Sequence, residues 1–91
     1  MAIIWTKSAY DDLERLYQFL AKVNINAAAK TLQSLAVAPE KLLPTPSIGQ
    51  ALPQYAPRNV RRYLVGDYEM RYELVAHDIL ILTIWHQREL R

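Results

Sequence analysis

The sequence contains no cysteine and only two glycines in 91 residues. The absence of cysteine excludes disulfides, thiolate metal sites and cysteine nucleophiles. Two glycines cannot build a phosphate-binding loop, and neither the P-loop pattern nor the dinucleotide-binding glycine pattern occurs. The zinc-protease motif H-E-x-x-H and the hydrolase motif G-x-S-x-G are also absent. These absences argue against nucleotide hydrolysis and zinc proteolysis.

The sequence also lacks a long hydrophobic run. The longest, Ile79 to Leu82 with Ile84 and Trp85 beyond Thr83, has the size of a strand. Nothing approaches the roughly 18 apolar residues of a transmembrane helix, and residues 1–8 do not resemble a signal peptide. We therefore expect a soluble cytoplasmic protein that does not contact a membrane.

What is present is a high apolar content and a small net charge. Apolar types make up 52% of the residues, which is too many for a disordered chain. The length suits one domain over residues 1–91. Eleven basic and nine acidic residues give a net charge of +2, too small to indicate a nucleic-acid binder by bulk charge. A role on nucleic acid would need a local basic patch.

The first half of the chain has helical periodicity after a short strand at Ala2 to Trp5. Thr6 or Ser8 can cap a helix that runs to about Val23. Its apolar residues recur at spacings of four, three and four, whereas Asp12 is expected on the opposite, solvated face. Asn24 or Asn26 can cap a second helix within residues 27–43, with a kink or break at Pro39. A loop rich in proline then follows from about Pro44 to Pro57.

The last third of the chain has strand periodicity. From Tyr68 to Leu74, even positions are apolar and odd positions are charged, which predicts a strand with one buried face. A strand at residues 59–65 precedes it across Gly66-Asp67, and a third at residues 79–85 follows a turn at His77-Asp78. We expect this third strand to be central and covered on both faces. The predicted fold is α+β, in the order β-α-α-β-β-β: an N-terminal strand, a helical hairpin and a three-stranded antiparallel meander.

Arginines cluster late in the chain. All four lysines precede residue 44, and every basic residue after the loop is arginine or histidine. Arginine offers a planar fork that suits phosphate and carboxylate. The late basic set consists of Arg58, Arg61, Arg62, Arg71, Arg88 and Arg91, with His86.

These late residues have two interpretations. For Arg71, flanked on its strand face by Glu69 and Glu73, cross-strand ion pairing is favoured over a functional role. One of Arg61 and Arg62 must point inward and needs a partner.

The two histidines give weak evidence for a site. His77 and His86 lie nine residues apart, without the spacing that places two ligands on one metal ion, so we predict no metal site and no cofactor. His86 closes the last strand and has the pKa range of a proton-transfer group, but no partner for acid–base catalysis can be named. A hydrogen-bonding role at the strand end is the favoured alternative.

Several stretches over nearly the whole chain occur in a recognisable order. They are Trp5-Thr6, a helix with Asp12-Leu13, an alanine-rich second helix, a Pro/Gly loop, Arg62-Tyr63-Leu64-Val65-Gly66-Asp67-Tyr68-Glu69-Met70-Arg71-Tyr72-Glu73 and Ile81-Leu82-Thr83-Ile84-Trp85-His86-Gln87-Arg88-Glu89. This order resembles the RelE/ParE superfamily of toxins from bacterial type II toxin–antitoxin systems. The resemblance implies the predicted fold and a cognate antitoxin, ParD-like in the ParE branch, whose flexible segment wraps the toxin.

The resemblance leaves two activities. RelE-like members cleave mRNA on the ribosome, whereas ParE-like members poison DNA gyrase and block replication. In this chain no lysine follows Lys41 and no tyrosine follows Tyr72, which leaves a thin set of nuclease candidates: Arg61, Arg62, Arg71 and His86. We therefore favour a ParE-like gyrase inhibitor that is not an enzyme, over a RelE/YoeB-like nuclease acting on ribosome-bound mRNA. A non-toxic binding module of the same fold is a third hypothesis.

The ParE-like hypothesis predicts two surfaces. The gyrase-binding surface would contain Arg61, Arg62, Arg71, His86, Arg88 and Arg91. The antitoxin would lie in a groove along the helix faces, because a small chain with 52% apolar residues is expected to expose one. The residues predicted for that groove are Leu13, Tyr17, Leu20, Leu32 and Leu35. Core packing accounts for Leu13 and Leu35 equally well.

Overall fold

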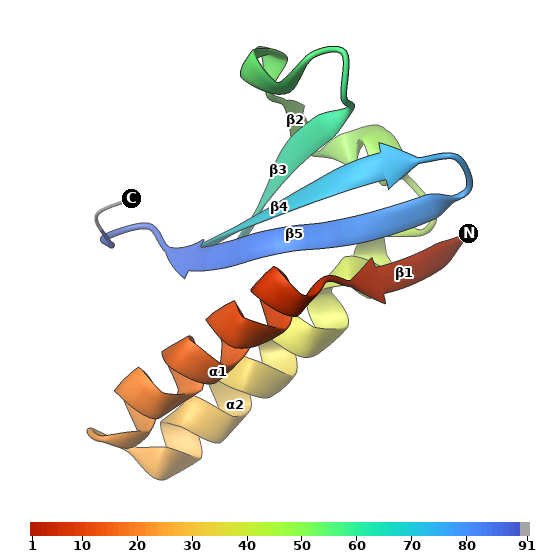
Figure 1. Cartoon of the computed structure of the whole chain (residues 1–91). Helices are drawn as coiled ribbons and strands as arrows, with labels where there is room; N and C mark the ends of the chain where they lie inside the picture. The colour runs from red at the N-terminus through yellow and green to blue at the C-terminus, as the bar shows by residue number, and fades with distance from the viewer. Residues whose placement is uncertain (90–91) are drawn as a thin grey trace.

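The computed structural model describes residues 1–89, which form a five-stranded sheet with a helical hairpin on one face (Figure 1). The chain begins with strand β1 (Ala2–Trp5) and helices α1 (Lys7–Ala21) and α2 (Ile25–Val37). Strands β3 (Val60–Val65), β4 (Tyr68–Val75) and β5 (Asp78–His86) follow the loop. The predicted α+β fold is therefore confirmed.

The sheet has the strand order β1-β5-β4-β3-β2, in which β2 is the short strand Gln50–Ala51. Strands β3, β4 and β5 form the predicted antiparallel meander, and β1 pairs with β5 in parallel. The turn between β3 and β4 lies at Gly66-Asp67 as predicted, with Gly66 at a positive φ of 58°. The turn between β4 and β5 lies at Ala76-His77, one residue earlier than predicted, because Asp78 already pairs with Val75.

The two helices begin and end at residues with a clear local cause. Thr6 and Asn24 are the N-caps, and their side chains accept hydrogen bonds from the backbone N–H of Ala9 and Ala27. The first helix ends at Ala21, two residues before the predicted end. Helix α2 ends at Val37, and a 3₁₀ helix, η1 (Ala38–Leu42), contains Pro39, so the predicted break is confirmed.

The proline-rich segment was predicted as a loop, but it contains regular structure. Two short 3₁₀ helices, η2 (Pro46–Ile48) and η3 (Pro53–Tyr55), flank the two-residue strand β2 (Gln50–Ala51). Strand β2 pairs with β3 opposite Arg61 and Arg62. Sequence periodicity did not reveal β2 because two residues cannot show a period.

The core lies between the helices and one face of the sheet. Even-numbered residues of β4 face the helices as predicted, and Met70 and Tyr72 are completely buried. On β5 the buried residues are Ile79, Ile81 and Ile84, a spacing interrupted by a bulge opposite Arg71 and Tyr72.

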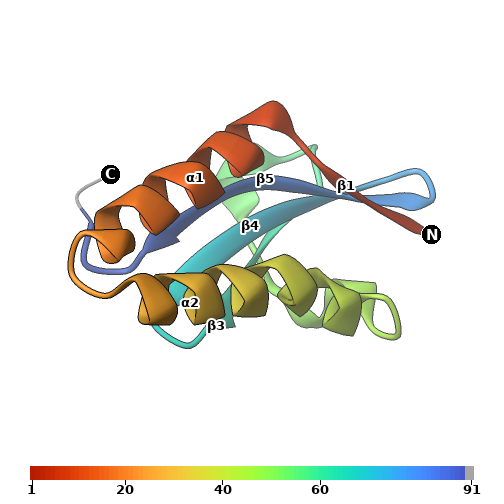
Figure 2. The same ribbon diagram turned by 90° about the horizontal axis from the view of Figure 1, so that it is seen from below.

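The opposite face of β5 differs from the prediction. Leu80, Leu82 and Trp85 are only half-buried, so this strand is central in the sheet but is fully covered on one face only. Both helices lie on the same side of the sheet, as Figure 2 shows from below.

Candidate functional site

A groove lies between the second half of α1 and the carboxyl end of β5. It has a volume of about 530 Å³ and mixes apolar side chains with a rim of charged and imidazole groups. The lining residues are Arg15, Leu16, Phe19, Leu20, Tyr68, His86, Arg88 and Glu89. The groove therefore combines part of the predicted gyrase-binding set with an apolar wall from α1.

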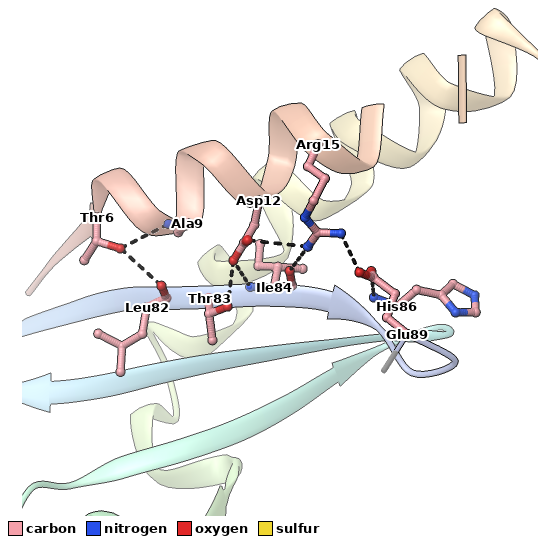
Figure 3. Close-up of polar contacts among 9 residues, drawn as sticks. All are labelled: Thr6, Ala9, Asp12, Arg15, Leu82, Thr83, Ile84, His86 and Glu89. Carbon is pink, nitrogen blue, oxygen red and sulfur yellow. Dashed lines mark hydrogen bonds and ion pairs between the residues drawn. The ribbon is translucent and has the colours of Figure 1, made fainter. Parts of the chain in front are cut away.

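A buried carboxylate fixes α1 to β5 beside this groove (Figure 3). One Asp12 oxygen accepts a hydrogen bond of 2.6 Å from the Thr83 hydroxyl and one of 3.0 Å from the backbone N–H of Ile84. Asp12 was predicted on the solvated helix face, and that prediction is wrong, because its exposed fraction is only 9%. Residues three before and four after it, Ala9 and Leu16, are both in the core, so Asp12 lies on the apolar stripe.

Arg15 extends the same network towards the end of the chain. Its guanidinium donates to the Ile84 carbonyl at 3.2 Å and lies 3.4 Å from Asp12. It also forms an ion pair with Glu89, and the Glu89 carboxylate accepts a hydrogen bond of 2.8 Å from the backbone N–H of His86. Figure 3 shows this chain of contacts from α1 to the residues after β5. The groove is thus bounded by a tail segment that side chains hold in place.

His86 has a defined hydrogen-bonding state in this groove. Its Nδ1 accepts a hydrogen bond of 3.1 Å from the backbone N–H of Arg88, so the neutral ring carries its proton on Nε2. The ring meets Tyr68 edge to face at a centroid distance of 5.1 Å. Burial raises the pKa of the Tyr68 phenol, and the nearby carboxylates of Asp67 and Glu89 raise it further. The groove therefore offers N–H and O–H groups as donors.

Arg61 bonds to the loop that precedes β2. Its guanidinium donates to the carbonyls of Ser47 at 3.0 Å and Gly49 at 2.8 Å, and to Asn59 at 3.1 Å. It is the inward arginine of the Arg61–Arg62 pair, since Arg61 stands opposite the buried Tyr72 on β4. These bonds hold the segment before β2, and they leave Arg61 poorly placed to contact a partner.

Arg71 lies on the sheet face away from the helices. It donates to Glu69 at 2.9 Å and to the Tyr55 hydroxyl at 2.9 Å. Its guanidinium carbon lies 4.7 Å from the centroid of the Trp85 ring and 5.8 Å from that of Tyr55, which is cation–π geometry. Burial lowers the pKa of Arg71, but the hydrogen bonds to Glu69 and Tyr55 outweigh it and the net pKa is raised. The favoured interpretation of Arg71 as an ion-paired residue agrees with these contacts.

Two further arginines share that face. Arg62 lies 3.4 Å from Glu69 and remains 39% exposed, so the Glu69 carboxylate, itself only 6% exposed as a residue, serves two guanidinium groups. Arg58 makes a two-point ion pair with Glu73 at 3.1 and 2.8 Å. The hydrogen bond from Arg58 lowers the pKa of Glu73. The arginine-rich sheet is therefore largely neutralised by its own glutamates.

The structure separates the five residues predicted for the antitoxin groove. Leu13 and Leu35 have exposed fractions of 8% and 1% and belong to the core. The prediction that they contact the antitoxin at the surface is therefore wrong. Tyr17, Leu20 and Leu32 are half-buried. The alternative of core packing holds for the two leucines because they face the sheet.

Three strongly exposed apolar residues of the hairpin were not among the predicted antitoxin contacts. They are Phe19 at 70%, Val23 at 86% and Ile25 at 61%. Phe19 lies off the main apolar stripe of α1, and this position in the sequence indicates an exposed side chain.

The described residues bring together part of the predicted gyrase-binding set. His86 and Arg88 share the groove, whereas Arg62 and Arg71 lie on the sheet face away from the helices. Arg91 lies outside the described residues. Within residues 1–89, no cluster of three His, Cys, Asp or Glu side chains could hold a metal ion. No helix in the same range is long and apolar enough to cross a membrane.

Comparisons with known proteins identify a matching family and a solved structure with a similar fold. The model of the family described as the ParE toxin of the type II toxin–antitoxin system, parDE, matches residues 3–91. A chain in a structure titled "Chromosomal ParDE TA system from P. aeruginosa" superimposes with a TM-score of 0.77 at 22% sequence identity. The alignment covers 94% of this chain and 95% of that one. No curated protein sequence matches significantly.

Proposed function

This chain belongs to the ParE toxin family of type II toxin–antitoxin systems, and from that membership we propose that it inhibits DNA gyrase and so blocks replication. The match over residues 3–91 is the observation that carries the proposal. We place this activity in the cytoplasm, where it needs no cofactor.

The contacts of the nuclease candidates support a binding role over catalysis. Cleavage of RNA by its own 2′-OH requires a general base, a general acid and cations that hold the phosphate. Arg61 is bonded to loop carbonyls, and Arg71 is ion-paired with Glu69. The Nδ1 atom of His86 already accepts a backbone hydrogen bond, so it cannot serve as a base without losing that contact.

The gyrase contact in this proposal is the rim of the 530 Å³ groove. Arg88 is exposed, and no ion pair involves it among residues 1–89. Beside it, His86 presents its Nε2–H, and the apolar wall of Phe19 and Leu20 gives area for packing. A cation beside an apolar wall suits a protein surface with a carboxylate near an apolar side chain.

The test uses purified protein in two assays run side by side. DNA supercoiling by gyrase should be inhibited, and ribosome-bound mRNA should remain intact. Arg88→Glu should weaken the inhibition about tenfold, by reversing a rim charge. Lys22→Glu, an equal charge change on the exposed end of α1, should have little effect. Cleavage of mRNA without inhibition of gyrase would replace this proposal by the RelE-like function, and inactivity in both assays would favour the non-toxic binding module.

We further propose that a ParD-like antitoxin from the neighbouring gene neutralises the toxin. Half-buried Tyr17, Leu20 and Leu32 and the exposed Phe19 provide apolar area on the hairpin for an amphipathic segment. Adding the antitoxin to the gyrase assay should restore supercoiling. If the antitoxin forms a complex but inhibition persists, it does not neutralise the toxin.

A further inference from the structure

Strand β1 forms an open edge of the sheet. It pairs with β5 on one side only, and Thr6 donates its backbone N–H to the Ile81 carbonyl, so even-numbered residues of β1 bond towards β5. The N–H and C=O groups of Ile3 and Trp5 therefore point away from the sheet. Within residues 1–89, no other strand, loop or side chain bonds to these four groups.

Strand β1 lacks the features that usually block an exposed edge. Residues 1–6 contain no charged side chain, no proline and no glycine, and over the described residues the pairing of β1 with β5 has no bulge. The first charged side chain, Lys7, is ion-paired with Asp11 at 2.8 Å. Figure 1 shows β1 at the margin of the sheet, with α1 continuing beyond its carboxyl end. The edge therefore offers unpaired backbone groups in uncharged surroundings.

The side chains that border this edge are apolar, and several are exposed. Ile3 and Trp5 pack against the core on the helix face, so Ile4 lies on the opposite face, where it is 45% exposed. On the helix face, Met1 is 58% and Tyr10 is 61% exposed. The ring centroids of Tyr10 and Trp5 are 6.0 Å apart. A partner strand at β1 would cover apolar side chains on both faces of the sheet.

A second copy of the chain fits this edge because the edge is self-complementary. In an antiparallel pair, residues whose N–H and C=O point across the gap stand opposite each other. Placing Ile3 opposite Trp5 of the second copy meets this condition, and a two-fold axis then places Trp5 opposite Ile3 of that copy. All the outward groups of Ile3 and Trp5 become hydrogen-bonded in both chains. Ile4 stands opposite its own copy as a non-hydrogen-bonded pair, in which side chains lie closest.

We propose that two copies of this chain associate through β1, antiparallel about a two-fold axis beside Ile4, so that their sheets join. The two Ile4 side chains cover each other, and Met1 of one copy lies near Tyr10 of the other, where its thioether contacts the ring. An interface built on such a short strand belongs to the class below about 1,200 Å², so we expect a dissociation constant of about 10–1,000 µM. The groove beside the carboxyl end of β5 involves the other end of α1. The dimer leaves it open, and the inference does not depend on the proposed function.

The first test is disulfide cross-linking, for which the chain is suited because it contains no cysteine. Non-hydrogen-bonded neighbours in an antiparallel pair have Cβ atoms at a separation that a disulfide can bridge. Under mild oxidation, Ile4→Cys should form a covalent dimer about tenfold faster than Ile48→Cys, or more. Ile48 is 62% exposed in η2, so its thiol controls for random collision. Equal rates for the two variants would overturn the proposal.

The second test measures the oligomeric state by sedimentation equilibrium. The wild type should dimerise at concentrations of about 0.1–1 mM. Ile4→Lys places two like charges opposite each other at the axis and should weaken the dimer about tenfold or more. Ile48→Lys makes the same exchange at a more exposed site and should dimerise like the wild type. A wild type that stays monomeric at about 1 mM, or equal dimerisation of the two variants, would refute association through β1.

The third test uses the unmodified chain and reads the register by hydrogen exchange. As protein concentration rises, the amides of Ile3 and Trp5 should exchange more slowly, in proportion to the monomer that remains. The Ile4 amide bonds towards β5 and should change little. Exchange of Ile3 and Trp5 that is independent of concentration would contradict the dimer. If these amides become protected only when an antitoxin or gyrase is added, the edge binds that partner and the assignment to a second copy fails.

Discussion

Replacing Asp12 by alanine should destabilise the fold strongly, because this carboxylate joins α1 to the edge of β5. One of its oxygens accepts hydrogen bonds from the Thr83 hydroxyl and the Ile84 N–H, and the other lies 3.4 Å from Arg15. Asp12→Ala leaves a buried N–H without an acceptor, which costs about 1–3 kcal/mol. It also removes a charge-assisted bond to Thr83, worth about 1.5–3 kcal/mol.

Partial rearrangement and water entry reduce the sum, so we expect a loss of about 2–4 kcal/mol in the free energy of unfolding. For a chain of this length, that loss corresponds to a decrease in Tm of roughly 10–25 °C. Asp12→Asn keeps one acceptor oxygen for Thr83 and Ile84 but turns an amide NH₂ towards Arg15. It should therefore lose less, about 1–2 kcal/mol.

The assay is urea unfolding followed by far-ultraviolet circular dichroism, with the slope m checked for constancy. Glu14→Ala, an exposed carboxylate on the same helix, is the matched control and should change stability by less than about 0.5 kcal/mol. A double-mutant cycle with Thr83→Val should give a coupling energy of about 1 kcal/mol. If Asp12→Ala costs no more than Glu14→Ala, the proposed anchoring of α1 by this carboxylate is wrong.

Two further predictions concern the sheet and the loop. The Tyr72 hydroxyl accepts from the Gly49 N–H at 2.9 Å and donates to the Pro46 carbonyl at 2.7 Å, so Tyr72→Phe should cost about 1–3 kcal/mol in urea unfolding; an unchanged midpoint would contradict this. The hydrogen bond from Arg58 lowers the pKa of Glu73 in the folded state. The ion pair therefore stabilises the fold at pH values above the unfolded pKa of about 4.3, and this stabilisation is lost as the pH falls through the lower pKa of the folded state. Comparing wild type with Arg58→Ala, the stability difference should be small at pH 7, because the Arg58 side chain is 53% exposed, and should vanish near pH 2. A difference that grows in acid would refute the sign.

Periodicity predicted the elements of this fold well, because each long element buries one face. The alternation from Tyr68 to Leu74 placed Met70 and Tyr72 in the core, and Thr6, Asn24 and Pro39 marked helix ends through local hydrogen bonding. Strand β2 could not be predicted, since its pairing depends on contacts distant in sequence.

The candidate site was less predictable from sequence. Arginine content indicated a recognition surface, but the partners of Arg61 are backbone carbonyls of a loop, and backbone acceptors have no sequence signature. Asp12 was classified as solvated because it is charged, although its spacing from Ala9 and Leu16 places it on the buried stripe. A charged residue in phase with the core residues indicates a buried polar contact, and that rule would have identified it.

The two edges of the sheet differ in a way that bears on partner binding. Strand β1 covers β5 only opposite Asp78 to Ile81, and side chains satisfy the edge beyond it. Thr6 donates to the Leu82 carbonyl, Asp12 accepts from the Ile84 N–H, and Glu89 accepts from the His86 N–H. An added strand would have to displace these groups and leave a buried carboxylate unpaired, which is costly. Strand β2 covers β3 only opposite Arg61 and Arg62, and within residues 1–89 no side chain bonds to the outward backbone groups of Leu64. Because exposed edges recruit further strands unless something blocks them, strand addition is favoured at β3 and disfavoured at β5. The same comparison predicts that Asp12→Ala, by freeing the Ile84 N–H, makes the β5 edge prone to self-association, which sedimentation velocity of the variant at increasing concentration would reveal.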